Sequence, residues 1–332
     1  MSDTLILSHR GAPRDATELQ KVIRSLTENV EQVIVGKKDV IELLAIGFLT
    51  GGHVLIEDVP GVGKTMIARS LARSVAGEYK RIQFTPDLLP SDVTGANLFN
   101  MKEQEFEFRQ GPIFTNILLA DEINRGTPRT QSSLLECMEE GVATADGVTY
   151  ELPQPFYVMA TQNPVEQYGT YPLPEAQLDR FCMRLRLGYP TAEEESEIVR
   201  SRIGGEPIEE LDAVMEPEDV LKIRDRITQI HVADNVREYS VQICAGTREH
   251  ENARLGASPR GSIWLVRIAQ GLAALEGRNF VIPHDVKRAA VPVLSHRVIA
   301  DPYAGSDEIS TDAVVRNVLN EIAVPVVGQK QE

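Results

Sequence analysis

Residues 53–65 read HVLIEDVPGVGKT and lead into MIARSLARSVA at residues 66–76. A short apolar run, a glycine-rich loop and a helical pattern follow one another. The loop fits GxxxxGK[ST], the pattern in which backbone N–H groups and a helix N-terminus surround a phosphate. The segment therefore predicts a strand and a helix joined by a phosphate-binding loop, which is the start of an α/β fold.

This loop also predicts the nucleotide contacts. Lys64 would reach the β- and γ-phosphates, and the Thr65 hydroxyl would ligate Mg²⁺. Gly61 and Gly63 would let the backbone approach a phosphate closely. Asp58 stands where the general pattern has its first glycine, and a carboxylate there is unfavourable unless it points away from the phosphates. The contacts expected from the loop and the first helical turn are Val59, Pro60, Gly61, Val62, Gly63, Lys64, Thr65 and Met66.

The rest of the first half alternates between apolar runs and helical patterns. The strands expected besides 53–57 are Arg81–Phe84, Asn116–Asp121, Phe156–Thr161 and Met183–Leu187. Strands separated by helices predict a parallel five-stranded sheet flanked by helices. Residues 86–112, with strand-like pieces at 96–99 and 105–109, and residues 142–155, a hairpin turning at Asp146-Gly147, predict excursions from the sheet.

From Thr191 onward the pattern is helical. Thr191 and Glu194 are spaced as a capping box at the start of a helix. We therefore expect three parts: a flexible leader at 1–16, an α/β nucleotide-binding domain at 17–190, and an all-α domain at 191–332. Two helices, over 17–29 and 37–49, would precede the first strand.

Two further strands are expected to end in polar residues. The run Asn116–Ala120 is followed by Asp121 and Glu122. Asp121 would hold Mg²⁺ through water, and Glu122 would activate the attacking water as a general base. The strand Phe156–Thr161 runs into Gln162 and Asn163. Because ligands bind at the carboxyl ends of strands in such sheets, Asn163 would orient the water or contact the γ-phosphate, the alternative being an Asn-Pro turn.

Composition narrows the class of protein. The chain has 332 residues, 34 Lys and Arg against 49 Asp and Glu, and a net charge of −15. Such a charge counts against general nucleic-acid binding without excluding a local phosphate pocket. Cys137, Cys182 and Cys244 have no metal-ligand spacing, which favours a reducing cytoplasm. The longest apolar stretch, Leu43 to Leu49, predicts no membrane insertion.

These motifs together resemble the AAA+ ATPases and, more narrowly, the MoxR family. The likeness covers residues 17 to 325 and rests on GGHVLIEDVPGVGKT (51–65), LLADEINRGTPRTQSSLLECMEEG (118–141), ATQNP (160–164), LPEAQLDRF (173–181) and GASPRGS (256–262). The resemblance implies a helical lid, a helix-2 insert at 86–112 and a hairpin before sensor 1 at 142–155. The form DVPGVGKT is similar to one that this family uses.

The resemblance also implies roles for residues outside the loop. Arg180 would be an arginine finger that enters the neighbouring subunit's site, and Arg125 a second interface candidate. Arg260 would be sensor 2, joining Lys64 from its own subunit; independently, Ser258 and Pro259 predict a helix that begins there. Val33, Val35 and Gly36 would line the adenine pocket. Met101, Phe106 and Phe108 would be either contact residues or the core of the insert.

The implied function is an ATP-hydrolysing ring, a homo-oligomer expected to be a hexamer, that remodels or activates client protein complexes. Its partner would be a separate protein with a von Willebrand factor A domain. A motor for metal or cofactor insertion, like the magnesium chelatase ATPase subunit, shares these motifs and stays open as an alternative. A DNA-remodelling ring is disfavoured by the charge, and a small-molecule kinase would need neither Arg180 nor Arg260.

Overall fold

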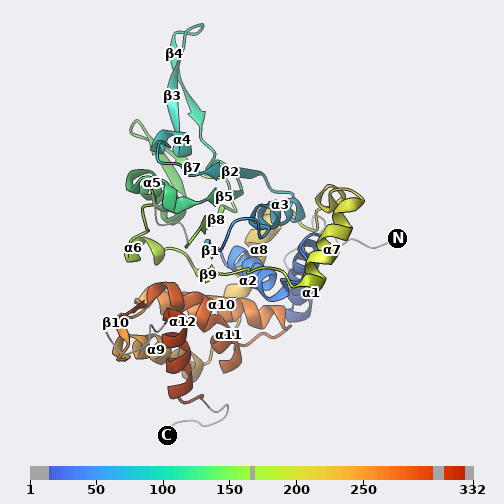
Figure 1. The fold of residues 1–332 in the computed structure, drawn as a ribbon, viewed down its shortest axis with the longest axis vertical. Helices are drawn as coiled ribbons and strands as arrows, with labels where there is room; N and C mark the ends of the chain where they lie inside the picture. Colours follow the sequence, from blue (N-terminus) through green and yellow to red (C-terminus); the bar gives the residue numbers. More distant parts are fainter. Residues whose placement is uncertain (1–14, 165–168, 302–309, 326–332) are drawn as a thin grey trace.

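A five-stranded parallel sheet forms the centre of the computed structural model, which describes residues 15–164, 169–301 and 310–325 (Figure 1). The strand order is β2-β5-β8-β1-β9, with every neighbouring pair parallel. The strands are β1 (Val54–Glu57), β2 (Tyr79–Gln83), β5 (Ile117–Asp121), β8 (Tyr157–Gln162) and β9 (Met183–Leu185). The five predicted strands and their parallel arrangement are confirmed.

Helices bury both faces of this sheet. Alternate residues of one strand enter different cores, since Val54 and Ile56 pack on one side of β1 and Leu55 on the other. The first core includes residues of α1 (Ala16–Glu31), α2 (Lys38–Leu49) and α3 (Lys64–Ser74), and the second includes residues of α5 (Pro128–Glu140). This packing leaves the carboxyl ends of the strands free to build a site.

Two hairpins leave the sheet, as predicted. The first follows α4 (Pro90–Thr94) and consists of β3 (Gly95–Asn100) and β4 (Glu105–Gln110), which project away from the sheet as a ribbon (Figure 1). The second, β6 (Val142–Ala145) and β7 (Val148–Glu151), turns at Asp146 and Gly147, both with positive φ.

The apolar residues of the first hairpin divide into two groups. Phe108 stacks on Tyr150 of β7 with ring centroids 4.0 Å apart, so it belongs to the core beneath the insert. Met101 is 86% exposed and Phe106 is 73% exposed, so both lie on the outer surface. The structure thus separates a core residue from two surface residues that the sequence had left undivided.

The second half of the chain is helical. It contains α7 (Ala192–Ile203), η3 (Pro207–Glu210), α8 (Pro217–Thr228), α9 (Asp234–Glu249), α10 (Pro259–Leu275), α11 (Pro283–Leu294), η4 (Ser295–Arg297) and α12 (Thr311–Glu321). Thr191 caps α7 in the predicted capping box, and Ser258 caps α10. No helix in the described residues has both the length and the apolar character needed to cross a membrane.

One feature of this helical part was not expected from the sequence. β10 (Ala253–Leu255) and β11 (Ile299–Ala300) pair as an antiparallel ribbon between helices. Strands of three and two residues are too short to show the alternation by which a strand is recognised. The lid is therefore helical with one small ribbon.

His53, directly before β1, is a neutral histidine that forms hydrogen bonds with the backbone of two other segments. Its Nδ1 accepts the N–H of Val158 at 3.0 Å, and its Nε2 lies 3.0 Å from the carbonyl of Met138. These two contacts define one neutral tautomer, with the proton on Nε2. Burial lowers the pKa of His53 from 6.5 to about 4.

The unfolded chain therefore binds a proton at His53 over a pH range in which the folded chain does not. Stability is expected to fall as pH drops from about 6.5 towards 4, with His53 contributing roughly 3 kcal/mol of that loss. Urea unfolding at several pH values measures the slope. His53→Gln should flatten it, whereas His284→Gln, at an exposed position, should not. An unchanged slope in His53→Gln would contradict this assignment.

Candidate functional site

The loop between β1 and α3 has the backbone of a phosphate cradle. Gly61 and Gly63 have φ of +87° and +91°, values that side chains rarely adopt. A Cβ at either position would meet nothing within 4 Å, so the space beside both backbones is open. Helix α3 begins at Lys64, directly after Gly63. The loop thus presents glycine backbone and a helix N-terminus to one open space.

That space is a cavity of about 280 Å³, which we call the phosphate cavity. It unites residues from the loop, the ends of β5 and β2, and the segment after β8. The predicted site residues that line it are Pro60, Gly61, Gly63, Lys64, Thr65, Met66, Asp121, Glu122 and Asn163. The Lys64 Nζ donates to the carbonyls of Asp58 and Val59 at 3.0 and 3.3 Å, so the ammonium lies across its own loop.

The two carboxylates after β5 are held by a threonine on β8. The Thr161 hydroxyl donates to Asp121 Oδ1 at 2.6 Å and accepts the N–H of Glu122 at 2.9 Å. Glu122 has φ of +54°, an uncommon left-handed conformation for a side-chain-bearing residue. Such conformations persist where surrounding contacts hold them, and they gather at functional sites. Thr161 thus fixes the two acidic residues relative to each other.

Two residues of the edge strand β2 complete the acidic end of the cavity, and the sequence reasoning missed both. Arg81 pairs with Asp121 Oδ2 at 2.7 Å, and the Gln83 amide donates to Glu122 Oε2 at 2.6 Å. Their register explains this, because Gln83 lies directly opposite Asp121 in the parallel ladder. Polar residues at every second position of a buried sheet's edge strand were the available signal.

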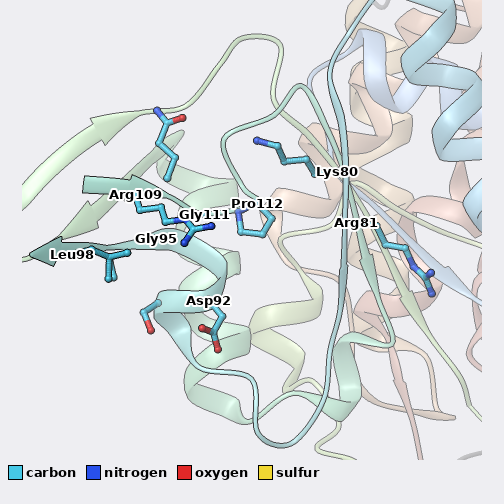
Figure 2. Close-up of a pocket in the computed structure, with 11 residues that line it drawn as sticks. Lys80, Arg81, Asp92, Gly95, Leu98, Arg109, Gly111 and Pro112 are labelled. Carbon is cyan, nitrogen blue, oxygen red and sulfur yellow. The ribbon is translucent and has the colours of Figure 1, made fainter. Parts of the chain in front are cut away.

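Arg81 also borders a second, open cavity of about 730 Å³ at the base of the β3–β4 hairpin. Lys80, Arg109 and Pro112 line it, and the Arg81 side chain points away from them (Figure 2). The Arg81 guanidinium therefore belongs to the phosphate cavity rather than to this groove.

Thr65 and Asp121 offer the oxygen ligands that Mg²⁺ prefers, a hydroxyl and a carboxylate. Both line the same cavity, so the residues fit the cation that the loop implies. A cation on Asp121 would share the carboxylate with Arg81 or displace the Arg81 guanidinium, since Asp121 Oδ2 already accepts a hydrogen bond from it. No group of three or more His, Cys, Asp or Glu that could hold a metal occurs in the described ranges, and Mg²⁺ in nucleotide sites needs none.

A larger and more apolar cavity, about 560 Å³, adjoins the loop. Val33 and Val35 lie on one side of it, and Ile198 and Ile203 of α7 lie on another. Gly61, Val62, Gly63 and Met66 line it as well, so it borders the phosphate cavity along the loop. Apolar walls beside a phosphate cradle suit a flat heteroaromatic base.

Two predicted contact residues line neither cavity. The Val59 carbonyl accepts a hydrogen bond from Lys64. Gly36 has φ of +75°, which side-chain-bearing residues rarely adopt, and an added Cβ would also meet the Glu194 carboxylate. Gly36 is therefore required for close packing between this segment and the start of α7, rather than for contact with a cavity.

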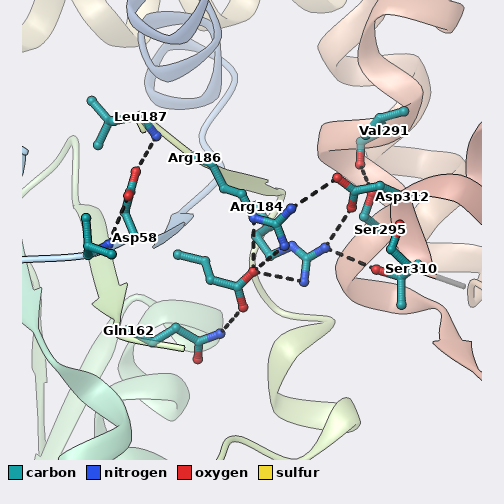
Figure 3. Close-up of polar contacts among 12 residues, drawn as sticks. Asp58, Gln162, Arg184, Arg186, Leu187, Val291, Ser295, Ser310 and Asp312 are labelled. Atoms are coloured by element: carbon teal, nitrogen blue, oxygen red, sulfur yellow. Dashed lines mark hydrogen bonds and ion pairs between the residues drawn. The ribbon is translucent and has the colours of Figure 1, made fainter. Parts of the chain in front are cut away.

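Asp58 points away from the phosphate cavity, which answers the question its position raised. Its carboxylate is buried and accepts the N–H groups of Leu187 and Gly188 at 2.6 and 2.7 Å, and that of Val59 at 2.9 Å. Figure 3 shows the side chain directed at the backbone beyond β9. Asp58 therefore ties the phosphate loop to the segment that leads into α7.

Asp58→Ala is expected to lower the free energy of unfolding by about 2–4 kcal/mol, because backbone N–H groups near Leu187 would lose their acceptor. Chemical denaturation measures the change. Asp234→Ala is the control, since that aspartate is 80% exposed and should change stability by under about 0.5 kcal/mol. A loss no larger than the control's would show that the Asp58 bonds are not structural.

The residue before Asp58 belongs to a charged network that reaches the C-terminal helix. Glu57 accepts from the Gln162 amide at 2.8 Å and from Arg186 at 2.7 Å, and it pairs with Arg184 at 3.4 Å. Both arginines also contact Asp312 of α12 (Figure 3). Burial acts to raise the pKa of Glu57, but the arginines and the amide outweigh it and the net pKa is lowered.

Arg180 and Arg260 lie together, away from the phosphate cavity. Arg180 pairs with Glu139 Oε2 at 3.1 Å, and Arg260 contacts Oε1 of the same carboxylate. Neither arginine lines either cavity beside the loop. In this structure Arg260 therefore lies beside Arg180, whereas the sequence placed it with Lys64, because α10 begins beside the segment between α6 (Glu175–Leu178) and β9 that carries Arg180.

Arg125, the second interface candidate, contacts the acidic end of the phosphate cavity. Its guanidinium donates to Glu122 Oε2 at 3.1 Å within the same subunit. Glu122 thus has two donors, Gln83 and Arg125, that share one carboxylate oxygen. These contacts hold the carboxylate at the mouth of the phosphate cavity.

Two family models match the chain. Residues 53–183 match the ATPase family associated with various cellular activities, and residues 245–318 match the AAA lid domain. The first range runs from β1 to β9 and so contains the loop, both carboxylates, Asn163 and Arg180.

Individual relatives match over nearly the whole chain. The uncharacterised protein YeaC of Bacillus subtilis is 50% identical, covering 93% of this chain and 97% of its own. Chaperone MoxR1 of Mycobacterium tuberculosis is 41% identical, covering 96% of this chain and 86% of its own. A crystal structure from Cytophaga hutchinsonii, of a protein assigned as an ATPase, is 39% identical with a TM-score of 0.87, covering 94% and 97% of the two chains.

Proposed function

The chain belongs to the MoxR family of AAA+ ATPases, and from this we propose that it hydrolyses ATP in a ring of identical subunits. One observation carries the ring: the phosphate cavity of one subunit contains Lys64 and both acidic residues, while Arg180 and Arg260 lie elsewhere on the same subunit. A head-to-tail contact would bring those arginines to the next subunit's nucleotide, and such contacts form a ring when the rotation between neighbours closes. Six subunits is the proposed number.

The proposed binding mode places the two ends of ATP in the two adjoining cavities. The adenine would lie between Val33, Val35 and the apolar side of α7, and the phosphates against Gly61, Gly63 and Lys64. Lys64 would exchange its two loop carbonyls for phosphate oxygens, which are stronger acceptors because they are charged.

Hydrolysis would use the residues at the strand ends. Glu122 would take a proton from the attacking water, and the Asn163 amide would orient that water against the γ-phosphate. Mg²⁺ held by Thr65 and Asp121 would neutralise charge on the phosphate oxygens. Arg180 and Arg260 of the neighbour would stabilise the charge that develops on the transferring phosphoryl group. The products would be ADP and phosphate.

Lys64→Ala is expected to weaken ATP binding by roughly 10- to 100-fold, since one charge-assisted contact is worth about 1.5–3 kcal/mol. Binding of a fluorescent ATP analogue measures it. Lys102→Ala, on the exposed hairpin, is the control and should bind normally. Tight binding by Lys64→Ala would overturn the assignment of the loop.

For the biological role we propose remodelling or activation of client protein complexes, together with a separate protein that has a von Willebrand factor A domain. The chaperone name of the 41%-identical relative supports the remodelling role. The exposed apolar residues at the end of the β3–β4 hairpin, Met101 and Phe106, suit contact with another protein. The three cysteines are free and buried, which suits a reducing cytoplasm.

A direct test is co-purification with the Glu122→Gln form in the presence of ATP, because slow hydrolysis would prolong the ATP-bound state. Recovery of a specific protein with ATP, and not with ADP, would support the remodelling role. Stimulation of ATP hydrolysis by duplex DNA, or by a metal-insertion complex, would instead favour one of the alternative motors.

A further inference from the structure

A buried arginine, Arg297, forms hydrogen bonds with the backbone on both sides of Arg180. Arg297, in η4, has a side chain that is 1% exposed. Its guanidinium donates to the carbonyls of Asp179 and Phe181 at 3.0 and 2.7 Å, and to that of Cys182 at 3.3 Å. It therefore contacts the residues on either side of Arg180, whose own side chain pairs with Glu139 instead.

The same guanidinium is paired with the carboxylate beside Arg180. Arg297 Nε donates to Asp179 Oδ1 at 2.8 Å, while the Ser258 hydroxyl donates to Asp179 Oδ2 at 3.0 Å. The Ser258 oxygen in turn accepts the backbone N–H of Arg260 at 3.2 Å, as the cap of α10. One chain of hydrogen bonds thus runs from Arg297 through Asp179 and Ser258 to Arg260.

This chain of contacts links two segments that lie far apart in the sequence. The outer ends of Arg180 and Arg260 meet on one carboxylate, Glu139, and their backbones are tied together by Asp179. Burying an ion pair costs so much desolvation that it contributes little net stability. A pair with a buried guanidinium that fixes two partly exposed arginines in one place has a use beyond stability.

We propose that Asp179 and Arg297 are positioning residues, which hold Arg180 and Arg260 as one unit for the nucleotide of the neighbouring subunit. This rests on the proposed ring function and extends it to two residues that line neither cavity beside the loop. Misplacing a catalytic group by about 1 Å costs about 10²-fold in rate. A variant that frees the Asp179 segment should therefore behave like a partial loss of the arginines.

The test uses Asp179→Asn, which keeps the shape of the side chain and removes its charge. The turnover number should fall by about 10- to 100-fold, while the KM for ATP and the affinity for an ATP analogue stay within about two-fold. Asp285→Asn is the matched control, because Asp285 is a buried partner of Arg278 at 2.6 Å in the same helical region. It should lose a similar amount of thermal stability and keep its turnover number.

Mixing separates positioning from simple destabilisation. Subunits with Glu122→Gln supply intact arginines, and subunits with Asp179→Asn supply an intact Glu122. We expect the mixture to be more active than either variant alone. A normal turnover number for Asp179→Asn, or a lowered one that mixing does not rescue, would overturn the proposal.

Two further measurements keep the outcome readable if Asp179→Asn folds poorly. Ser258→Gly removes the hydroxyl that bonds Asp179 and costs little as a helix cap, because glycine is tolerated there. It should also lower turnover and be rescued by Glu122→Gln subunits, and a normal turnover would count against the proposal.

The Arg180→Ala and Glu122→Gln mixture is run in parallel. Failure of that mixture would overturn the ring function and this proposal together, whereas failure confined to Asp179→Asn and Ser258→Gly would overturn only this proposal.

Discussion

Glu122→Gln is expected to lower the rate of ATP hydrolysis by about 10²–10⁴-fold, the range that a general base contributes. ATP binding should remain, because glutamine keeps the size of the side chain and Lys64, Thr65 and the glycines are unchanged. The amide can still accept from Gln83 or Arg125, so the cavity should keep its shape. Single-turnover hydrolysis and analogue binding measure the two effects separately.

The control for this variant is Glu140→Gln, which alters an exposed glutamate at the end of α5. Its hydrolysis rate should match that of the unaltered protein. If Glu122→Gln also turned over ATP at a near-normal rate, Glu122 would not be the base and the acidic end of the cavity would serve only to hold the cation.

Arg180→Ala is expected to lower turnover by about 10³-fold or more, by analogy with the 10³–10⁵ that arginine fingers contribute in GTPases. The physical reason is that the charge on the transferring phosphoryl group would lose a cation supplied by the neighbouring subunit. ATP binding to the altered subunit should change little, because Arg180 lies outside both cavities of its own subunit.

Arg129→Ala, which removes an exposed arginine of α5, is the matched control and should keep normal turnover. Arg180→Ala should also free the Glu139 Oε2 contact, leaving Arg260 as the remaining partner of that carboxylate. A loss of ATP affinity in Arg180→Ala as large as that of Lys64→Ala would mean that Arg180 acts within its own subunit.

Local patterns predicted the phosphate loop, the strand ends and the five strands because each is specified by consecutive residues. Gly61, Gly63 and Lys64 need only the strand before them and the helix after them. The meeting of Asp121, Glu122 and Asn163 follows from a general rule, since parallel strands bring their carboxyl ends to one edge.

Features that depend on distant contacts were less accessible. The direction of the Asp58 carboxylate is determined by N–H groups about 130 positions further along the chain. The place of Arg260 depends on how α10 packs beside the segment of Asp179. The role of Arg81 depends on strand register, which places Arg81 opposite Leu119 of β5, close enough for its guanidinium to pair with Asp121. Neighbouring residues in the sequence do not specify any of these three features.

Mixing Arg180→Ala and Glu122→Gln proteins in equal amounts tests whether each site is built from two subunits. Each variant alone should be nearly inactive. In randomly mixed rings, about one site in four would combine an intact Glu122 with a neighbour's intact Arg180, so activity should recover to about a quarter of normal. A mixture no more active than the two separate variants would contradict the account, because sites complete within one subunit could not be rescued.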